Sequence, residues 1–334
     1  MLAPSALPLA AHYDLAMLDL DGVVYVSGEA VPGAPEHLAA ARAAGLRLAF
    51  ITNNASRPPQ VVADHLVELG VPATPDDVVT SAQAAAHVLR ERLGPGAPVV
   101  LLGAAGLEQA LREQDLVPVG VEAEAAALVT GYGPDVLWRD VMRAAVRVRD
   151  GLWWVASNTD LSIPTAYGTA PGHGVLVDML RRFTGVEPVV AGKPARPLLD
   201  ETVRRVGGRR PLMVGDRLDT DIEGATNAGV DSLLVLTGVT GLSELASTPT
   251  SQRPTYLAAD LGGLLDPHPA VAVVDGVGHA PGWQARVTGG GRLTVTGSGA
   301  AGDWWRAAAA ACWAWLDETG APADVSDVVT PPAG

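Results

Sequence analysis

Two carboxylates separated by one residue stand at the end of a short apolar run near the N-terminus. Residues 15–18 read Leu-Ala-Met-Leu, and Asp19, Asp21 and Gly22 follow them at once. A short apolar run that ends in a glycine turn is typical of a buried strand in an α/β sheet. Ligands of open α/β sheets bind outside the carboxyl ends of the strands, so Asp19 lies where the chemistry of such a sheet takes place. The same residues also fit an ordinary Asp-Gly turn, and the segment alone does not decide between the two.

Three later segments place chemically active side chains after apolar runs in the same way. Thr52 follows an expected strand at 46–51, Lys193 follows one at 189–191, and an acidic turn from Asp216 to Asp221 follows one at 211–214. Lys193 is the only lysine, because 22 of the 23 Lys and Arg residues are arginine. Thr52-Asn53-Asn54 could simply cap a helix, and capping is compatible with phosphate binding at the same helix start.

Phosphoryl transfer through an aspartyl-phosphate needs these residue types. A carboxylate attacks phosphorus, and a neighbouring acid protonates the leaving alkoxide and then activates water. A hydroxyl and an ammonium hold the non-bridging oxygens, and a hard cation such as Mg²⁺ neutralises charge between the phosphate and the carboxylates. Without the lysine and the cation, the anionic nucleophile and the anionic phosphate would repel each other.

In this order, the four segments resemble the motifs of the haloacid dehalogenase (HAD) superfamily. Residues 19–25, Asp-Leu-Asp-Gly-Val-Val-Tyr, look like its DxDGxxY motif, and Gly215-Asp216 through Asp221 looks like its GDxxxxD motif. Thr52 and Lys193 match the second and third motifs. The resemblance implies that Asp19 is the nucleophile and Asp21 the general acid and base. It also implies that the Asp19 carboxylate, the Asp21 main-chain carbonyl and Asp216 hold Mg²⁺, with Asp221 nearby through water.

Finer features resemble one subfamily, the class IIA (NagD-like) phosphatases. They are the triplet at 52–54, the insertion after it, and the loop that runs from Asn158 through Asp160 and Pro164-Thr165 to 171–174 (Pro-Gly-His-Gly). The resemblance covers about residues 14 to 265. The abundance of Ala, Gly and Pro and the near absence of lysine look like the product of a GC-rich genome. This composition and the appended tail are most similar to actinobacterial glycerol-3-phosphate phosphatases, whose tails resemble a truncated acetyltransferase (GNAT-like) unit. This tail lacks the acetyltransferase pyrophosphate loop, so we expect no catalytic role for it.

The expected fold is α/β: a Rossmann-like parallel-sheet HAD core, an inserted α/β cap of the C2 type, and a small α+β extension. Short loops between alternating strands and helices favour a parallel sheet with right-handed crossovers. We expect core segments at 10–80 and 188–266, the cap at 81–187 and the extension at 267–334. In the extension we expect strands at 270–275 and 293–296 and a helix at 303–318, which holds four of the eight tryptophans and should present a packing face.

A cap that roofs the site would limit substrate size and favour small phosphomonoesters. Glycerol 3-phosphate is the first expectation, and phosphoglycolate, a sugar phosphate or a nucleotide comes next. Gly22, Asn53, Asn54 and Asp160 are the expected substrate contacts. Dehalogenases lack a second acid like Asp21, phosphonatases need a further lysine, and transport ATPases need membrane spans. A binding module without activity, acting through its tail, is the alternative outside enzymes, although the intact acids disfavour it.

Net charge and cysteine content indicate which kinds of binding partner and which cellular compartment to expect. A net charge of −14 argues against a nucleic-acid partner. Cys312 is the single cysteine, so no intrachain disulfide can form and a reducing compartment is the default. No run of about 18 apolar residues predicts a membrane span, and residues 1–12 do not read as a signal peptide. We therefore expect a cytoplasmic enzyme, for which the resemblance suggests a homodimer formed through the cap.

Overall fold

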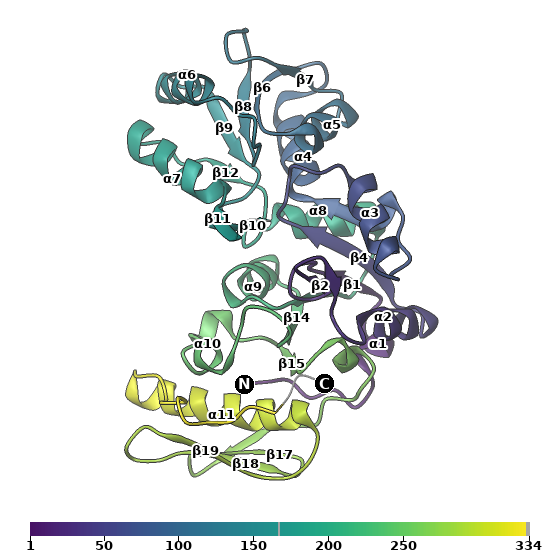
Figure 1. Ribbon diagram of the computed structural model, residues 1–334, viewed down its shortest axis with the longest axis vertical. Coiled ribbons are helices and arrows are strands. Elements are labelled where there is room, and N and C mark those ends of the chain that lie inside the picture. The colour runs from purple at the N-terminus through teal and green to yellow at the C-terminus, as the bar shows by residue number, and fades with distance from the viewer. Residues whose placement is uncertain (166–167, 332–334) are drawn as a thin grey trace. The chain divides into compact units, whose positions relative to one another are not determined.

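The computed structural model describes residues 1–165 and 168–331, and these fall into two compact units (Figure 1). Unit 1 comprises Met1–Leu48, Leu69–Val71 and Gly208–Gly334, and unit 2 comprises Ala49–Glu68 and Pro72–Gly207. These divisions do not test the four expected segments, whose boundaries remain predictions. In the part of the chain that the structure describes, no helix is both long enough and apolar enough to cross a membrane.

Unit 1 holds four parallel strands in the order β15-β14-β13-β1. Their bounds are β1 Leu15–Leu18, β13 Pro211–Gly215, β14 Asp231–Val235 and β15 Tyr256–Ala258. All four residues of β1 are buried, as expected for a central parallel strand covered on both faces. The helical elements of the unit are α1 Leu9–His12, α2 Ala34–Ala43, the π-turn Leu218–Ile222, α9 Glu223–Ala228, α10 Leu242–Ala246 and the 3₁₀ turns Thr250–Gln252 and Leu261–Leu264. The expected strands at 15–18 and 211–214 and the expected parallel pairing are confirmed.

The C-terminal extension is an antiparallel sheet of four strands with one long helix against it (Figure 1). The elements are β16 Ala272–Val274, β17 Val277–Ala280, β18 Trp283–Val287, β19 Leu293–Gly297 and α11 Ala301–Thr319. The two middle strands were not predicted, because Gly276 and Pro281-Gly282 interrupt the apolar pattern. Both glycines have positive φ, 73° and 75°, and they form the hairpin turns.

The extension shares a hydrophobic core with the parallel strands of unit 1. Trp304, Trp305 and Trp313 are buried in the same cluster as Leu234 and Leu257. The Trp313 indole donates a hydrogen bond to the main-chain oxygen of Leu245 at 2.8 Å. The predicted packing face of the tryptophan-rich helix is confirmed, and it packs on the α/β core.

Unit 2 is built on a second parallel sheet, here named the cap sheet, with the order β12-β9-β8-β6-β7. Its strands are β6 Pro98–Leu102, β7 Val117–Val119, β8 Ala127–Thr130, β9 Trp153–Ala156 and β12 Val189–Val190. The unit also holds α3 Pro59–Glu68, the 3₁₀ turn Pro75–Asp77, β5 Val78–Thr80, α4 Ser81–Leu93, α5 Ala105–Glu113, α6 Trp138–Arg149, α7 His173–Thr184, α8 Pro197–Val206 and the hairpin β10 Ser162–Thr165 with β11 Gly168–Pro171. We expected β12 to resume the core, whereas it pairs with β9 at the edge of the cap sheet.

Strand β4, Arg47–Thr52, begins in unit 1 and ends in unit 2. Its first residue, Arg47, donates its amide to the main-chain oxygen of Asp14 at 3.4 Å in unit 1. In unit 2 its last three residues pair in parallel with β5, and Thr52 lies opposite Thr80.

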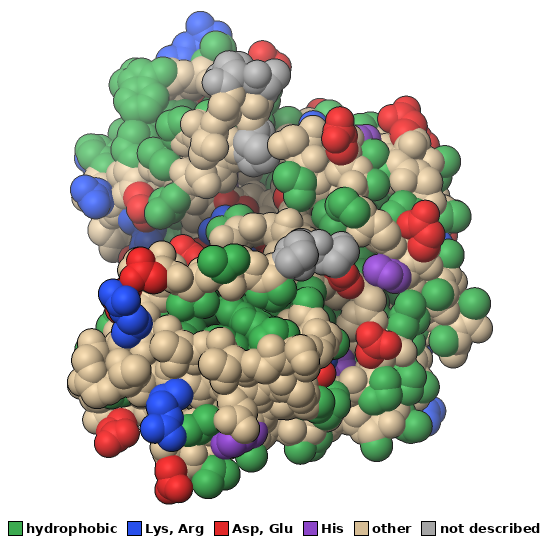
Figure 2. Space-filling view, turned by 60° about the horizontal axis from the view of Figure 1, so that its bottom comes forward, with side chains coloured by type: hydrophobic (Ala, Val, Ile, Leu, Met, Phe, Trp, Pro, Cys, Tyr) green, Lys and Arg blue, Asp and Glu red, His purple; other side chains and the backbone are tan. Residues whose placement is uncertain are grey.

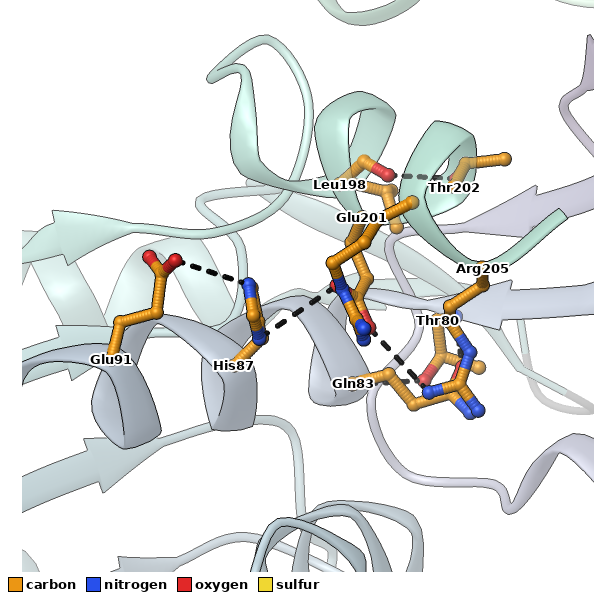
Figure 3. Close-up of polar contacts among 9 residues, drawn as sticks. Thr80, Gln83, His87, Glu91, Leu198, Glu201, Thr202 and Arg205 are labelled. Carbon is orange, nitrogen blue, oxygen red and sulfur yellow. Dashed lines mark hydrogen bonds and ion pairs between the residues drawn. The ribbon is translucent and has the colours of Figure 1, made fainter. Parts of the chain in front are cut away.

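A buried carboxylate joins α4 to α8, the helix that follows Lys193 (Figure 3). The Glu201 side chain is 0% exposed and accepts two hydrogen bonds from Arg204, at 2.6 and 2.7 Å. Arg205 lies 3.5 Å from the same carboxylate, and His87 of α4 lies 4.0 Å from it. The two arginines belong to α8 and compensate the buried charge, and the His87 contact is the one that reaches α4.

Candidate active site

Three aspartates that follow the parallel strands of unit 1 form a cluster. Asp19 follows β1, and its amide donates to the main-chain oxygen of Val214 in β13 at 2.9 Å. One carboxylate oxygen each from Asp19, Asp216 and Asp221 lies within 4.8 Å of the others. Because like charges this close disfavour one another, the arrangement favours a bound cation.

Two glycines and one amide hold the carboxylate of Asp216, which is fully buried. The Val239 amide donates to Oδ2 of Asp216 at 2.6 Å. A Cβ on Gly22 would lie 2.3 Å from that oxygen, and a Cβ on Gly238 would lie 2.0 Å from it. The Thr237 hydroxyl donates to the main-chain oxygen of Gly22 at 2.6 Å, which joins the two glycine segments. Gly22, predicted as a substrate contact, therefore has a clear structural role beside Asp216.

Asp221 shapes the turn that carries Asp216. Its Oδ2 accepts hydrogen bonds from the amides of Asp216 and Arg217, both at 3.1 Å. A Cβ on Gly215 would lie 2.3 Å from the Asp221 carboxylate, so only glycine fits at the end of β13. Asp221 was expected near the metal, acting through water; its carboxylate lies in the acidic cluster, and its action through water remains a prediction.

Asp21 lies in a tight loop that closes directly after β1. The main-chain oxygen of Leu20 accepts from the amides of Val23, Val24 and Tyr25, at 3.3, 2.9 and 3.2 Å. Gly22 turns the chain with a φ of 87°. The Asp21 side chain is exposed and is not one of the clustered carboxylates. An exposed acid that is held on a rigid loop can exchange a proton with a substrate or with water.

The donor set of the unit 1 cluster fits Mg²⁺. Mg²⁺ prefers a few carboxylate oxygens and keeps several waters. The three clustered carboxylates are of this kind, and the expected ligands Asp19 and Asp216 are among them. The Asp21 main-chain carbonyl remains a predicted ligand.

In unit 2, Thr52 and Asn54 form the turn that leads into α3. Thr52 Oγ1 accepts from the Asn54 amide at 3.1 Å, and Asn54 Oδ1 accepts from the Ser56 amide at 2.9 Å and the Ser56 hydroxyl at 2.7 Å. These are the local side-chain turns that threonine and asparagine favour. Because α3 begins only at Pro59, the triplet does not cap that helix, and the contact of Thr52 and Asn54 with a phosphate remains a prediction.

Lys193, Asn53 and Asp160 lie together in unit 2, although they are distant in sequence. Lys193 is 2% exposed, and its amide donates to Oδ1 of Asn53 at 2.8 Å. Asn53 Nδ2 donates to the Lys193 main-chain oxygen at 3.0 Å and to Oδ1 of Asp160 at 2.9 Å. Asn158 Nδ2 donates to the Asn53 main-chain oxygen at 2.6 Å. The Asn158–Asp160 loop after β9 is thus tied to the Asn53 turn.

Sequence reasoning missed several residues of these two arrangements. Ser81 donates its hydroxyl to the Asn53 main-chain oxygen at 2.6 Å, and Val239 donates its amide to Asp216. The Thr-Gly-Val turn at 237–239 follows β14, another parallel strand of unit 1, and this place at a strand end was the available signal. Ser81 carried no signal, since it reads as an ordinary helix start.

His173, from the 171–174 loop motif, is a buried structural residue. Its Nε2 lies 3.1 Å from the Thr130 hydroxyl, which also accepts from the Trp154 indole at 3.0 Å. Burial lowers the pKa of His173 to about 4, so the ring is neutral at pH 7. It lies beneath the Asp160 loop, because the Gly174 amide donates to the Asp160 main-chain oxygen at 2.8 Å.

Family models match the two parts of the chain that carry the predicted motifs. A haloacid dehalogenase-like hydrolase model matches residues 16–117, and a HAD-hydrolase-like model matches residues 190–264. The first contains Asp19, Asp21 and Thr52, and the second contains Lys193, Asp216 and Asp221.

Curated and solved relatives resemble the chain over most of its length. It is 44% identical to the D-glycerol 3-phosphate phosphatase of Mycobacterium tuberculosis, over 87% of this chain and 80% of that one. It is 35% identical to the 5'-nucleotidase YutF of Bacillus subtilis, over 72% of this chain and 93% of that one. The crystal structure of the M. tuberculosis glycerol phosphate phosphatase with magnesium superposes with a TM-score of 0.84 at 42% identity. That match covers 96% of this chain and 94% of the other, so it includes the C-terminal extension.

Proposed function

The chain belongs to the haloacid dehalogenase-like hydrolases, and we propose that it is a Mg²⁺-dependent phosphatase whose native substrate is glycerol 3-phosphate. The observation that carries the proposal is the cluster of Asp19, Asp216 and Asp221 after the parallel strands of unit 1. The D-glycerol 3-phosphate phosphatase of M. tuberculosis, at 44% identity, supports the choice of substrate.

In the proposed reaction, Asp19 attacks phosphorus and the phosphate–oxygen bond to glycerol breaks. Asp21 gives its proton to the leaving alkoxide, which departs as glycerol. The Asp21 carboxylate then takes a proton from water, whose oxygen attacks the aspartyl-phosphate and releases inorganic phosphate and Asp19. The Thr52 hydroxyl and the Lys193 ammonium would stabilise the negative charge of the phosphoryl oxygens. Mg²⁺, held by Asp19, Asp216 and the Asp21 carbonyl, would supply further charge neutralisation.

Two variants test the nucleophile. Asp19→Asn keeps the size of the side chain but removes the attacking charge, so turnover of glycerol 3-phosphate with Mg²⁺ should be abolished and no phosphate should be trapped on the enzyme. Asp76→Asn makes the same change at an exposed position of a 3₁₀ turn and should retain wild-type activity. Wild-type turnover by Asp19→Asn would refute the mechanism.

The B. subtilis 5'-nucleotidase at 35% identity favours a nucleotide as the second candidate substrate. Values of kcat/KM for glycerol 3-phosphate, phosphoglycolate, a sugar phosphate and a nucleoside 5'-monophosphate would distinguish the candidates. Glycerol 3-phosphate should give the highest value. If 4-nitrophenyl phosphate and all of these are left intact with Mg²⁺ present, the binding-module alternative holds instead.

Apolar stripes on α6 and α7 support a homodimer formed through the cap. Val175 and Phe183 are exposed and lie eight residues apart, two turns along one side of α7. Trp138 and Met142 are more than half exposed on α6, and Figure 2 shows hydrophobic side chains gathered at the upper left, over this part of unit 2. Exposed apolar patches of this kind mark interaction sites. Phe183→Glu should convert a dimer into a monomer in sedimentation experiments, and a wild-type monomer would refute the proposal.

A cytoplasmic location fits this substrate, because a charged phosphomonoester does not cross a lipid bilayer unaided. Cys312 is buried, and burial raises the pKa of its thiol to about 12, so this residue is unreactive. Cell fractionation followed by immunoblotting tests the location, and recovery of the protein outside the cytoplasm would refute it.

A further inference from the structure

The carboxamide of Asn53 has its hydrogen-bonding groups committed to the protein. An asparagine amide group offers two N–H donors and one carbonyl acceptor. One donor reaches Oδ1 of Asp160 at 2.9 Å, and the other reaches the Lys193 main-chain oxygen at 3.0 Å. The carbonyl oxygen accepts from the Lys193 amide at 2.8 Å. Both N–H donors are therefore in use, and a phosphate oxygen could receive one only by displacing a protein acceptor.

The Asn53 side chain packs closely against Gly192, and its main chain is held by two further hydrogen bonds. A Cβ on Gly192 would lie 2.6 Å from Asn53 Oδ1 and 2.7 Å from the main-chain oxygen of Ser157, so the Asn53 carboxamide packs closely against Gly192. The Asn53 main-chain oxygen accepts from Ser81 and from Asn158, both at 2.6 Å. The buried amide is thus fixed from both its main chain and its side chain.

We propose that Asn53 is a positioning residue, which fixes the main chain of Lys193 and ties it to Asp160, and that it does not bind substrate itself. The inference rests on the proposed function, in which the Lys193 ammonium stabilises the phosphoryl group. Electrostatic catalysis depends on groups held in place before the reaction, and a displacement of about 1 Å can cost about 10²-fold in rate. Asp160 then acts on the lysine through Asn53, whose Nδ2 donates to Asp160 Oδ1.

A positioning role and a substrate contact predict different kinetics. If Asn53 positions Lys193, its loss lowers kcat for every phosphomonoester, because Lys193 acts on the phosphoryl group that all of them share. If Asn53 or Asp160 binds the alcohol part, its loss affects glycerol 3-phosphate and spares 4-nitrophenyl phosphate. Both substrates must therefore be measured with each variant.

An exchange of the two side chains gives the sharpest test. Asn53→Asp places a carboxylate against the Asp160 carboxylate and removes the donor to Lys193, so kcat should fall roughly 10²-fold on both substrates. The double variant Asn53→Asp, Asp160→Asn restores an amide donor between positions 53 and 160, and it should regain about ten-fold over Asn53→Asp. Asp160→Asn alone can present its amide oxygen to Asn53 and should lose less than Asn53→Asp.

Gln109→Glu is the matched control. Gln109 Nε2 donates to Glu113 Oε1 at 2.8 Å on the exposed side of α5, so this variant also sets a carboxylate against a carboxylate. It should leave kcat and KM on both substrates unchanged. Asn53→Ala, with its thermal melt, removes the same contacts without adding charge, and it should also lose kcat on both substrates.

Three results would overturn the positioning role: wild-type kcat in Asn53→Ala, a loss confined to glycerol 3-phosphate, or a double variant no better than Asn53→Asp. Failure of the proposed function is distinguishable from these, since it would appear as a wild-type enzyme without activity on either substrate.

Discussion

Lys193 and Asn53 lie 140 positions apart in the chain and exchange two hydrogen bonds, Lys193 N to Asn53 Oδ1 at 2.8 Å and Asn53 Nδ2 to Lys193 O at 3.0 Å. Both bonds reach the main chain of the lysine, so any residue at position 193 except proline could keep them. The lysine itself is buried. A substitution at this position therefore tests the chemistry of the cationic group itself.

Lys193→Arg should retain the fold and the positive charge and lose roughly 10²-fold or more in kcat/KM, the scale of one lost preorganised donor. An ammonium is a compact point charge, whereas a guanidinium is a wide planar fork. The measurement is kcat/KM beside a thermal melt. Near-wild-type turnover with an unchanged melt would show that any cation serves at this position. Arg139→Lys, the reverse exchange at an exposed position of α6, is the control and should change neither value.

Gly238→Ala should weaken Mg²⁺ binding. A Cβ at Gly238 would lie 2.0 Å from Asp216 Oδ2, so the carboxylate must move from its hydrogen bond with Val239. Groups that orient metal ligands typically change metal affinity 10–100-fold when altered, and we expect about this rise in the Mg²⁺ concentration for half-maximal activity. The rise in melting temperature on adding Mg²⁺ should shrink in parallel.

Gly289→Ala is the control for this variant, because a Cβ there meets no atom within 4 Å. It should keep the Mg²⁺ dependence of the wild type. If Gly238→Ala also keeps that dependence, the glycine is not required for the position of Asp216.

The strands and the acidic residues could be predicted from sequence because they depend on local pattern. Continuous apolar runs such as those before Asp19 and Asp216 are typical of buried parallel strands. Both predicted strands form. What could not be predicted depends on residues distant in sequence. The Asn53–Asp160 contact joins positions 107 apart, and the contact of Val239 with Asp216 depends on which strand follows β13 in the sheet. The strand that precedes Lys193 was assigned to the core, because two apolar residues do not specify which sheet they join.

Acid should destabilise the protein partly through His268. Its Nε2 lies 2.8 Å from the Gly263 main-chain oxygen, and Arg306 donates to its Nδ1 at 3.1 Å, so the folded state holds a neutral ring. Burial lowers the pKa of His268 to about 4, from about 6.5 in the unfolded chain. Between these pH values the unfolded state binds more protons, so stability falls as the pH falls from about 6.5 towards 4.

His268→Gln should therefore reduce the drop in melting temperature between pH 7 and pH 5. Part of the drop should remain, because burial also lowers the pKa of His173. His279→Gln makes the same substitution at a half-buried histidine of β17 and is the control for the exchange itself. An equal drop in His268→Gln and the wild type would mean that other groups determine the acid sensitivity.

Removal of the C-terminal extension at Pro267 should cost solubility or stability while every predicted catalytic residue remains. The cut takes away Trp313 and Arg306, which donate to the main-chain oxygens of Leu245 and Leu257 at 2.8 and 3.0 Å, and it uncovers the apolar cluster beneath α11. An apolar patch of that kind promotes aggregation. Trp313→Ala in the full chain tests the same packing without truncation. It should lower the free energy of unfolding by about 3–5 kcal/mol, as for other buried tryptophans. A truncated protein as soluble, stable and active as the full chain would make the extension an independent appendage.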